Sequence, residues 1–163
     1  MSPTFAKLNL KDQSDIVVVN APASFEPEIA SLHGVTVRRA MADAKQVGFS
    51  LAFATTQKEV DAVAKAIARK AAGDAIVWVA YPKGSSKKYT CEFNRDSGWA
   101  SMGAAGFEPV RMVAIDEDWS ALRFRRAEFI KTMTRPQEYR YSAHAKARTD
   151  RHVGQRAKVK GQK

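Results

Sequence analysis

The sequence contains one cysteine and no long hydrophobic run. Cys91 has no second cysteine with which to form an internal disulfide or a zinc site, which favours a reducing compartment and a packing role for Cys91. The longest apolar run is the seven residues Ala75–Tyr81, whereas a membrane-spanning helix requires roughly 20. The first residues, MSPTFAKLNLKDQSD, lack the apolar stretch of about 7–15 residues found in a secretory signal. These absences predict a cytoplasmic protein with no membrane partner.

Common catalytic motifs are also missing. The chain has no P-loop spacing G-x-x-x-x-G-K-[ST], no nucleophile-elbow glycines and no H-E-x-x-H pair. His33, the only histidine before residue 135, lies in a predicted loop beside Gly34, where it is either a surface residue or an acid–base group. The three carboxylates Asp116, Glu117 and Asp118 are better explained as a solvated turn than as a cation site, because adjacent side chains splay apart. We therefore predict no catalytic residue and no metal site, and lean against an enzyme.

The composition indicates one ordinary globular domain followed by a basic segment. The chain has 163 residues, of which 45% are apolar and 27% charged. Residues 135–163 hold nine basic and two acidic residues, so they carry +7 of the net charge of +10. We predict a domain at 1–134 and a flexible tail at 135–163.

The basic tail is the predicted contact with a polyanion. Lysine and arginine side chains release counterions from nucleic acid without reading its sequence, and Tyr139 and Tyr141 could stack on unpaired bases. A disordered, solubilising extension explains the composition equally well. The predicted nucleic-acid-binding residues are Arg140, Lys146, Arg148, Arg151, Arg156, Lys158 and Lys160.

The pattern of the first 134 residues alternates between strands and helices. Short apolar runs predict strands at 16–19, 35–41, 49–55 and 75–81. Thr56 and Glu59 have capping-box spacing and precede an apolar stripe that predicts a helix ended by Gly73. Shorter helices are predicted at 25–32, with Ser24 as cap, at 96–105 and at 127–133.

The last two predicted strands, 110–115 and 120–125, are separated by only four residues, too few for a parallel crossover. They therefore form an antiparallel hairpin. The fold class is α/β: an open, doubly wound, Rossmann-like sheet, mostly parallel, with a C-terminal antiparallel hairpin. Ligands of such folds bind beyond the carboxyl ends of the strands.

This order of elements resembles the core of class I, S-adenosylmethionine-dependent methyltransferases. Three short motifs also resemble an uncharacterised bacterial family of unknown function. They are N-A-P at Asn20–Pro22, W-x-x-x-P-K from Trp78 to Lys83, and the counterpart of its D-x-W-S, which is Asp116 or Asp118 with Trp119-Ser120. The resemblance extends over residues 8–126 and implies a methyltransferase-like fold.

The first turn departs from the methyltransferase pattern. Those enzymes place glycines after their first strand so that the backbone can approach the cofactor. Here no glycine occurs between Asp15 and His33, and Pro22 and Pro27 remove backbone donors. The sequence thus predicts no cofactor and argues against S-adenosylmethionine binding.

The candidate crevice lies between the N-A-P turn and the loop PKGSSKK. Its predicted ligand-binding residues are Asn20, Pro22, Thr55, Lys83, Gly84 and Ser85. Glycine, serine and lysine together can cradle an anion, although a mobile, solvated loop accounts for the same residues. The favoured function is a non-catalytic binding domain with a basic tail that contacts nucleic acid or an acidic protein. The alternative is a divergent methyltransferase or another enzyme that binds a nucleotide-like molecule in this crevice.

Overall fold

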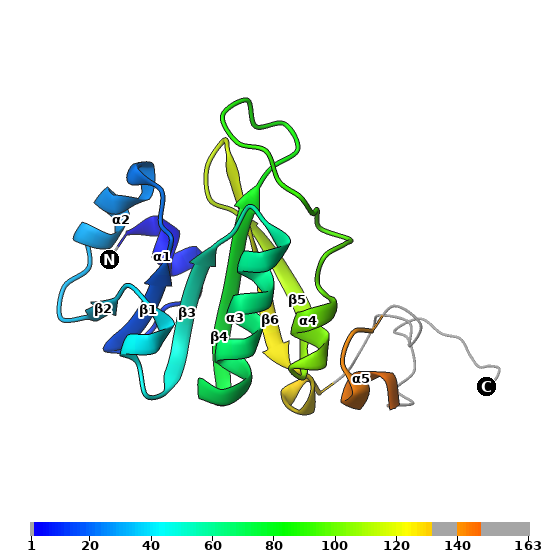
Figure 1. The fold of residues 1–163 in the computed structure, drawn as a ribbon. Coiled ribbons are helices and arrows are strands. Elements are labelled where there is room, and N and C mark those ends of the chain that lie inside the picture. Colours follow the sequence, from blue (N-terminus) through cyan, green and yellow to red (C-terminus); the bar gives the residue numbers. More distant parts are fainter. Residues whose placement is uncertain (1, 132–139, 148–163) are drawn as a thin grey trace.

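The computed structural model describes residues 2–131 and 140–147, which form a six-stranded mixed sheet with the order β2-β1-β3-β4-β6-β5 (Figure 1). This arrangement confirms the predicted α/β fold class. The strands are β1 (Asp15–Val19), β2 (Thr36–Arg38), β3 (Val47–Phe53), β4 (Ala71–Pro82), β5 (Phe107–Ala114) and β6 (Trp119–Arg126). The α-helices are α1 (Pro3–Lys7), α2 (Glu26–Ala30), α3 (Gln57–Lys70), α4 (Ala100–Ala104) and α5 (Ala143–Ala147).

Only the last strand runs against the others. The first four strands pair in parallel, and β6 pairs antiparallel with both β4 and β5. The predicted hairpin is confirmed, and β5 therefore points the same way as β4. The carboxyl ends of β1, β3 and β4 all meet at one edge of the sheet, as expected for a doubly wound fold.

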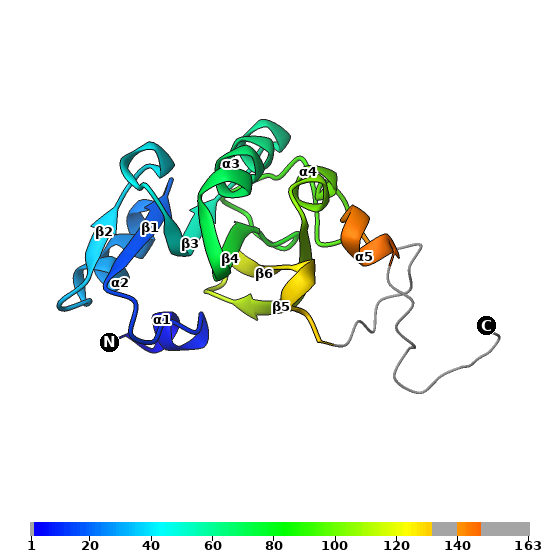
Figure 2. The ribbon, with the colours of Figure 1, turned by 90° about the horizontal axis from the view of Figure 1, so that it is seen from below.

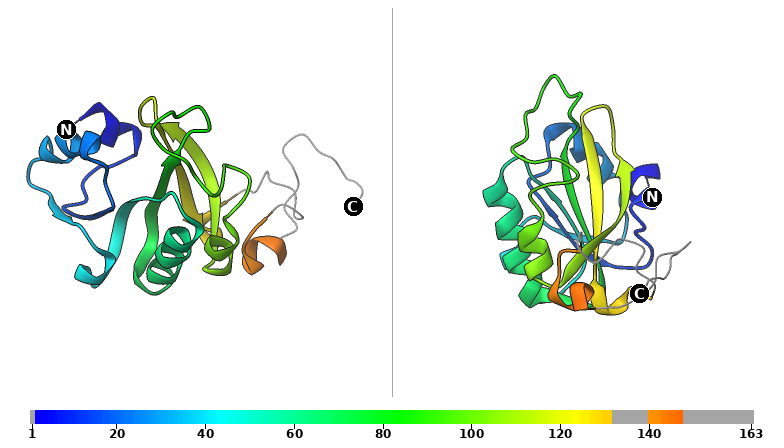
Figure 3. Two further views of the ribbon diagram at one scale, coloured as in Figure 1. Left: turned by 45° about the horizontal axis from the view of Figure 1, so that its top comes forward. Right: turned by 90° about the vertical axis from the view of Figure 1, so that its right-hand side faces the viewer.

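Helices cover both faces of the sheet (Figures 2 and 3). On one face, the apolar stripe of α3 and Met102 of α4 pack over Val77, Val79 and Phe124. On the other face, apolar residues of α1 and α2 pack over β1, β3 and Trp78 of β4. No helix in the described part of the chain is long and apolar enough to cross a membrane.

Helix α3 begins as predicted. The Thr56 hydroxyl accepts a hydrogen bond from the Glu59 amide, and the Glu59 carboxylate accepts one from the Thr56 amide, which completes the capping box. Its end differs from the prediction, because the chain leaves the helix at Ala71 and enters β4 directly. Gly73 does have the left-handed φ of 55°, but within β4.

The short helices were predicted less accurately. Pro3–Lys7 forms α1, which the sequence analysis did not predict although Ser2 caps it and Pro3 starts it. The helix predicted at 25–32 is a 3-10 turn (Ala23–Phe25) followed by α2, and Ser24 does not cap it. The helix predicted at 96–105 shortens to α4, since Asn94 and Ser97 form an isolated bridge before it. Residues 127–129 form a 3-10 turn.

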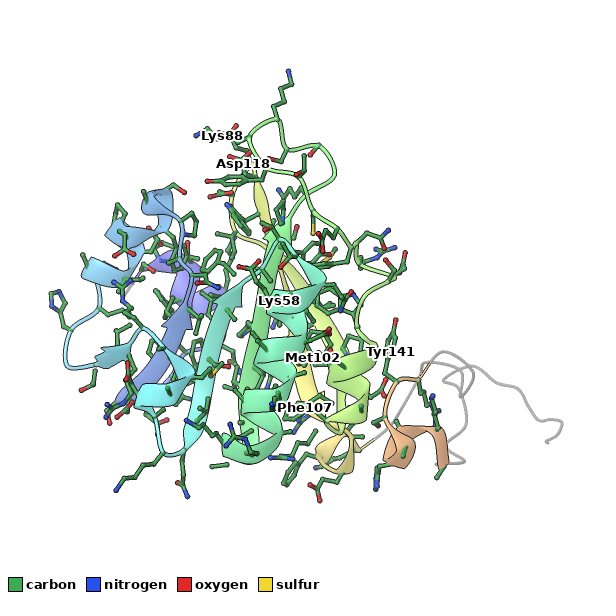
Figure 4. All side chains as sticks on the ribbon, viewed as in Figure 1. Lys58, Lys88, Met102, Phe107, Asp118 and Tyr141 are labelled. Carbon is green, nitrogen blue, oxygen red and sulfur yellow. The ribbon has the colours of Figure 1, made fainter. Side chains whose placement is uncertain are left out.

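Residues 140–147, which the sequence analysis assigned to the tail, pack against the domain. Ser142 and Ala145 are fully buried, and Ala145 packs on Ala127. The buried carboxylate of Glu108 accepts hydrogen bonds from the amides of Tyr141 and Ser142. We call residues 140–147 the docked segment; Figure 4 shows Tyr141 beside α4.

Candidate ligand site

The turn after β1 is built around Asn20. Its backbone has a φ of 58°, the left-handed conformation that glycine usually supplies and that asparagine adopts more readily than most residues. Because β1 lies beside β3, the Asn20 amide nitrogen reaches the carbonyl of Phe53 at 3.5 Å and a carboxylate oxygen of Glu59 at 3.4 Å. The first turn therefore obtains an unusual backbone angle without glycine.

Glu59 connects the ends of β1 and β3 with the start of α3. One of its oxygens accepts from the Thr55 amide at 2.9 Å and also from the Thr55 hydroxyl and the Thr56 amide and hydroxyl. Burial raises the pKa of Glu59, but these hydrogen bonds outweigh it, so the pKa lies below its usual value of 4.5. The hydrogen-bonding groups of Thr55 are thus used within the fold.

This arrangement predicts an acid-dependent contribution to stability. A carboxyl whose pKa is lowered by folding stabilises the protein above its unfolded-state pKa, near 4.5, and loses that contribution as the pH falls through the folded-state pKa. The Glu59→Gln variant is expected to be less stable than the wild type at pH 7, with the difference shrinking at about pH 3. Urea unfolding at both pH values measures this. A difference that is the same at both pH values would contradict it.

The loop after β4 is tied to the β5–β6 hairpin. The Lys83 amide donates to the Asp118 carbonyl at 2.8 Å, and the Ser86 hydroxyl donates to the Asp118 carboxylate at 2.9 Å. An oxygen of Asp116 accepts from the amides of Asp118 and Trp119, so these two carboxylates organise the turn. Figure 4 shows Lys88 and Asp118 together at this end of the molecule.

A pocket of about 680 Å³ lies between residues 82–95 and strands β4, β5 and β6. Aromatic rings of Tyr81, Tyr89 and Phe93 line it, and Lys83 and Arg95 add positive charge. Its volume lies within the range of about 300–1,000 Å³ typical of small-molecule sites. Its remaining lining residues are Pro82, Gly84, Ser86, Thr90, Cys91, Glu92, Asn94, Met112 and Ser120.

Two titratable groups in this pocket are held neutral. Burial raises the pKa of the Tyr81 hydroxyl, which lies 3.3 Å from the Met112 sulfur. Burial likewise raises the pKa of the Cys91 thiol, so the thiolate that would act as a nucleophile is disfavoured. The lining therefore offers flat apolar surfaces and two cations rather than an activated nucleophile.

The structure brings only two of the six predicted ligand-binding residues to the pocket. Lys83 and Gly84 line the pocket, whereas Asn20, Pro22, Thr55 and Ser85 are not among its lining residues. Sequence reasoning missed Tyr81, Tyr89, Phe93 and Arg95. The alternation of aromatic and basic residues in KKYTCEFNR was the available signal, since rings and cations together are typical of sites for planar anions.

The predicted nucleic-acid-binding residues fall mostly outside the described residues. Arg140 lies in the docked segment, is 2% exposed and donates to the Ala145 carbonyl at 2.8 Å. Lys146 is exposed on α5. The other five, Arg148, Arg151, Arg156, Lys158 and Lys160, lie outside the described ranges.

Comparison with solved structures identifies the fold. A SAM-dependent methyltransferase from Aquifex aeolicus aligns with a TM-score of 0.54 and 12% identity, over 76% of this chain and 87% of that one. The pyocyanin biosynthetic protein PhzM aligns with a TM-score of 0.50 and 12% identity, over 76% of this chain and 54% of its own length. No family model and no curated protein matches the sequence. The fold is therefore methyltransferase-like, with the six-stranded sheet described above.

The comparison also corrects the prediction about S-adenosylmethionine. The sequence analysis predicted no cofactor and argued against this one because the first turn lacks glycine. That prediction is contradicted, since a protein described as SAM-dependent has this fold over most of the chain. The prediction rested on glycine for a close approach of the backbone to the cofactor, whereas this first turn obtains its left-handed backbone conformation at Asn20 without glycine.

Proposed function

We propose that this chain is a methyltransferase-like domain that binds a small molecule with a planar ring and an anionic group in the pocket beside residues 82–95. The observation that carries this proposal is the pairing of aromatic walls with Lys83 and Arg95 in a pocket of about 680 Å³. The pocket adjoins the carboxyl end of β4, where ligands of doubly wound sheets bind. The protonated Cys91 and Tyr81 support binding rather than covalent catalysis at this site.

S-adenosylmethionine belongs to the proposed ligand class, because it combines a planar adenine with a carboxylate. The likeness to a SAM-dependent methyltransferase makes it the first ligand to test. In this proposal the rings of Tyr81, Tyr89 and Phe93 hold the adenine, and Lys83 or Arg95 pairs with the carboxylate. A charged hydrogen bond of this kind contributes about 1.5–3 kcal/mol.

The test is isothermal titration with S-adenosylmethionine, S-adenosylhomocysteine and adenosine. We expect S-adenosylmethionine and S-adenosylhomocysteine to bind. Adenosine, which has the ring without the carboxylate, is expected to bind at least about 10-fold more weakly. Lys83→Ala is expected to weaken binding of S-adenosylhomocysteine by a similar factor. Lys88→Ala is the matched control, since Lys88 lies in the same loop and does not line the pocket. Equal affinities of Lys83→Ala and Lys88→Ala for S-adenosylhomocysteine would contradict the proposal. The absence of binding of all three compounds to the wild type would contradict it as well.

The basic C-terminal residues support a second function, contact with nucleic acid. Residues 148–163 contain six basic residues and one acidic residue, and Lys146 just before them is exposed. A chain shortened to residues 1–147 keeps the docked segment and removes this charge. It is expected to lose most of its affinity for a single-stranded oligonucleotide and to show a smaller salt dependence. If the shortened chain keeps the oligonucleotide affinity and the salt dependence of the full chain, this function is ruled out.

A further inference from the structure

Three arginines gather on one face of the β5–β6 hairpin. Arg111 of β5 and Arg123 of β6 are directly paired across the antiparallel ladder, and Arg125 follows two positions later on the same strand. Arg123 is also paired with Trp78 of β4, which packs with the residues of α1. Since side chains alternate between faces, these arginines lie on the face that carries α1. We call Arg111, Arg123 and Arg125 the arginine patch.

Helix α1 covers only part of this face. The Trp78 indole donates to the Leu8 carbonyl just after α1, and the Lys7 amine donates to the Ala114 carbonyl at the far end of β5. Helix α1 therefore reaches β5 only at its end, and in Figure 2 it lies to the left of β5, with no helix of the described residues below β5 itself. Arg111 is accordingly exposed, whereas Arg123 and Arg125 are partly exposed.

The positive charge of the arginine patch is only partly neutralised. Arg125 forms a bidentate ion pair with Asp74, with nitrogen–oxygen distances of 2.6 and 2.8 Å. Glu108 is paired with Arg125 in the ladder, but the Glu108 carboxylate accepts hydrogen bonds from amides of the docked segment. Within residues 2–131 and 140–147, the side chains of Arg111 and Arg123 form no ion pair or hydrogen bond with another residue.

Two like charges at directly opposite positions of a ladder destabilise a sheet. Here Arg123 bears a further cost, because its Nε–H is shielded from solvent and meets no acceptor in the described residues. Burial is the main cause that lowers the pKa of Arg123, and repulsion from Arg125 and Arg111 adds to it. An anion bound between Arg111 and Arg123 would remove this repulsion.

We propose that the arginine patch binds a phosphate group. A phosphate has enough acceptor oxygens, at tetrahedral angles, to take hydrogen bonds from two guanidinium groups on neighbouring strands at once. Arg125 remains paired with Asp74, which neutralises its charge, so Arg111 and Arg123 supply the attraction for the anion. This site is separate from the proposed ligand pocket, because Tyr81 and Met112 of the pocket lie on the opposite face of the sheet.

The test uses the full chain and two probes, inorganic pyrophosphate and a short single-stranded oligonucleotide, which distinguish a free phosphate from one in a polymer. Arg111→Gln is the main variant, since Arg111 is exposed and its replacement leaves the core intact. Arg69→Gln is the matched control, an exposed arginine of α3 on the other face with the same change of charge. NMR of the arginine Nε–H groups during pyrophosphate titration reports the site directly.

We expect Arg111→Gln to weaken binding of at least one probe by about 10-fold, while Arg69→Gln binds both probes as the wild type does. Weakening of pyrophosphate binding identifies free phosphate as a ligand, and weakening confined to the oligonucleotide identifies a nucleic-acid phosphate. If free phosphate is the ligand, the Arg123 Nε–H signal is expected to shift during titration with pyrophosphate. If the ligand is a nucleic-acid phosphate, the signal is expected to shift during titration with the oligonucleotide. Equal affinities of Arg111→Gln and Arg69→Gln for both probes would overturn the proposal.

Discussion

Replacement of Trp78 by alanine is expected to destabilise the domain by about 3–5 kcal/mol, a large part of the stability of a typical domain. Trp78 is fully buried in β4 at the centre of the sheet, between the pairs formed with Leu51 and Arg123. Its ring packs with apolar residues of α1, and its indole N–H donates to the Leu8 carbonyl at 2.7 Å. The substitution removes a large packed volume and one buried hydrogen bond together.

Two conservative variants separate packing from hydrogen bonding. Trp78→Phe keeps most of the apolar volume but leaves the Leu8 carbonyl without its donor, which costs about 1–3 kcal/mol. Trp119→Phe is the matched control, because the Trp119 ring is also buried and its N–H has no acceptor among the described residues. Removing a donor that is already unsatisfied relieves a cost, so Trp119→Phe is expected to be the less destabilising of the two.

Denaturant unfolding of the three variants measures these differences. The expected order of destabilisation is Trp78→Ala, then Trp78→Phe, then Trp119→Phe. If Trp119→Phe proves as costly as Trp78→Phe, the hydrogen bond to Leu8 does not account for the difference between the two sites. Loss of that hydrogen bond also frees the chain after α1, so the amide protons of α1 are expected to exchange faster in Trp78→Phe.

The parts of the fold that the sequence predicted are those with a strong local signal. The Thr56–Glu59 capping box and the apolar stripe behind it define α3, and the unbroken apolar run at 75–81 defines the buried part of β4. The hairpin followed from the connection of only four residues, 116–119, between its two predicted strands. Helix α1 was missed because five residues give no apolar periodicity, and it depends on a distant contact between Leu8 and Trp78.

The candidate site was predicted only in part for a related reason. Sequence position indicates that Lys83 follows a strand, and the structure does place Lys83 and Gly84 at a pocket. The side of β4 on which the pocket lies depends on where residues 85–95 fold back, which no periodicity records. Asn20 shows a further limit, since the sequence analysis did not predict its left-handed backbone conformation. The arginine patch is equally invisible in sequence, because Arg111 and Arg123 are opposed only through the register of the hairpin.

The second large effect is expected at Gly103, which lies beneath the docked segment. A Cβ added at Gly103 would stand 2.3 Å from the Tyr141 Cβ and 2.4 Å from the Tyr141 carbonyl carbon and oxygen. Such distances are far inside van der Waals contact, and backbone atoms cannot rotate away as a side-chain end can. Gly103→Ala is therefore expected to push residues 140–147 off α4, at a cost of about 1–3 kcal/mol.

Hydrogen exchange gives the specific readout. In the wild type the amides of Tyr141 and Ser142 are held by the Glu108 carboxylate, so they should be protected. Gly103→Ala should abolish that protection while α3 and the sheet keep theirs. Gly48→Ala is the control, because a Cβ there meets nothing within 4 Å. Glu108→Ala should release the same two amides by removing their acceptor without adding volume. Unchanged protection of Tyr141 and Ser142 in Gly103→Ala would show that the docked segment does not lie against α4 in solution.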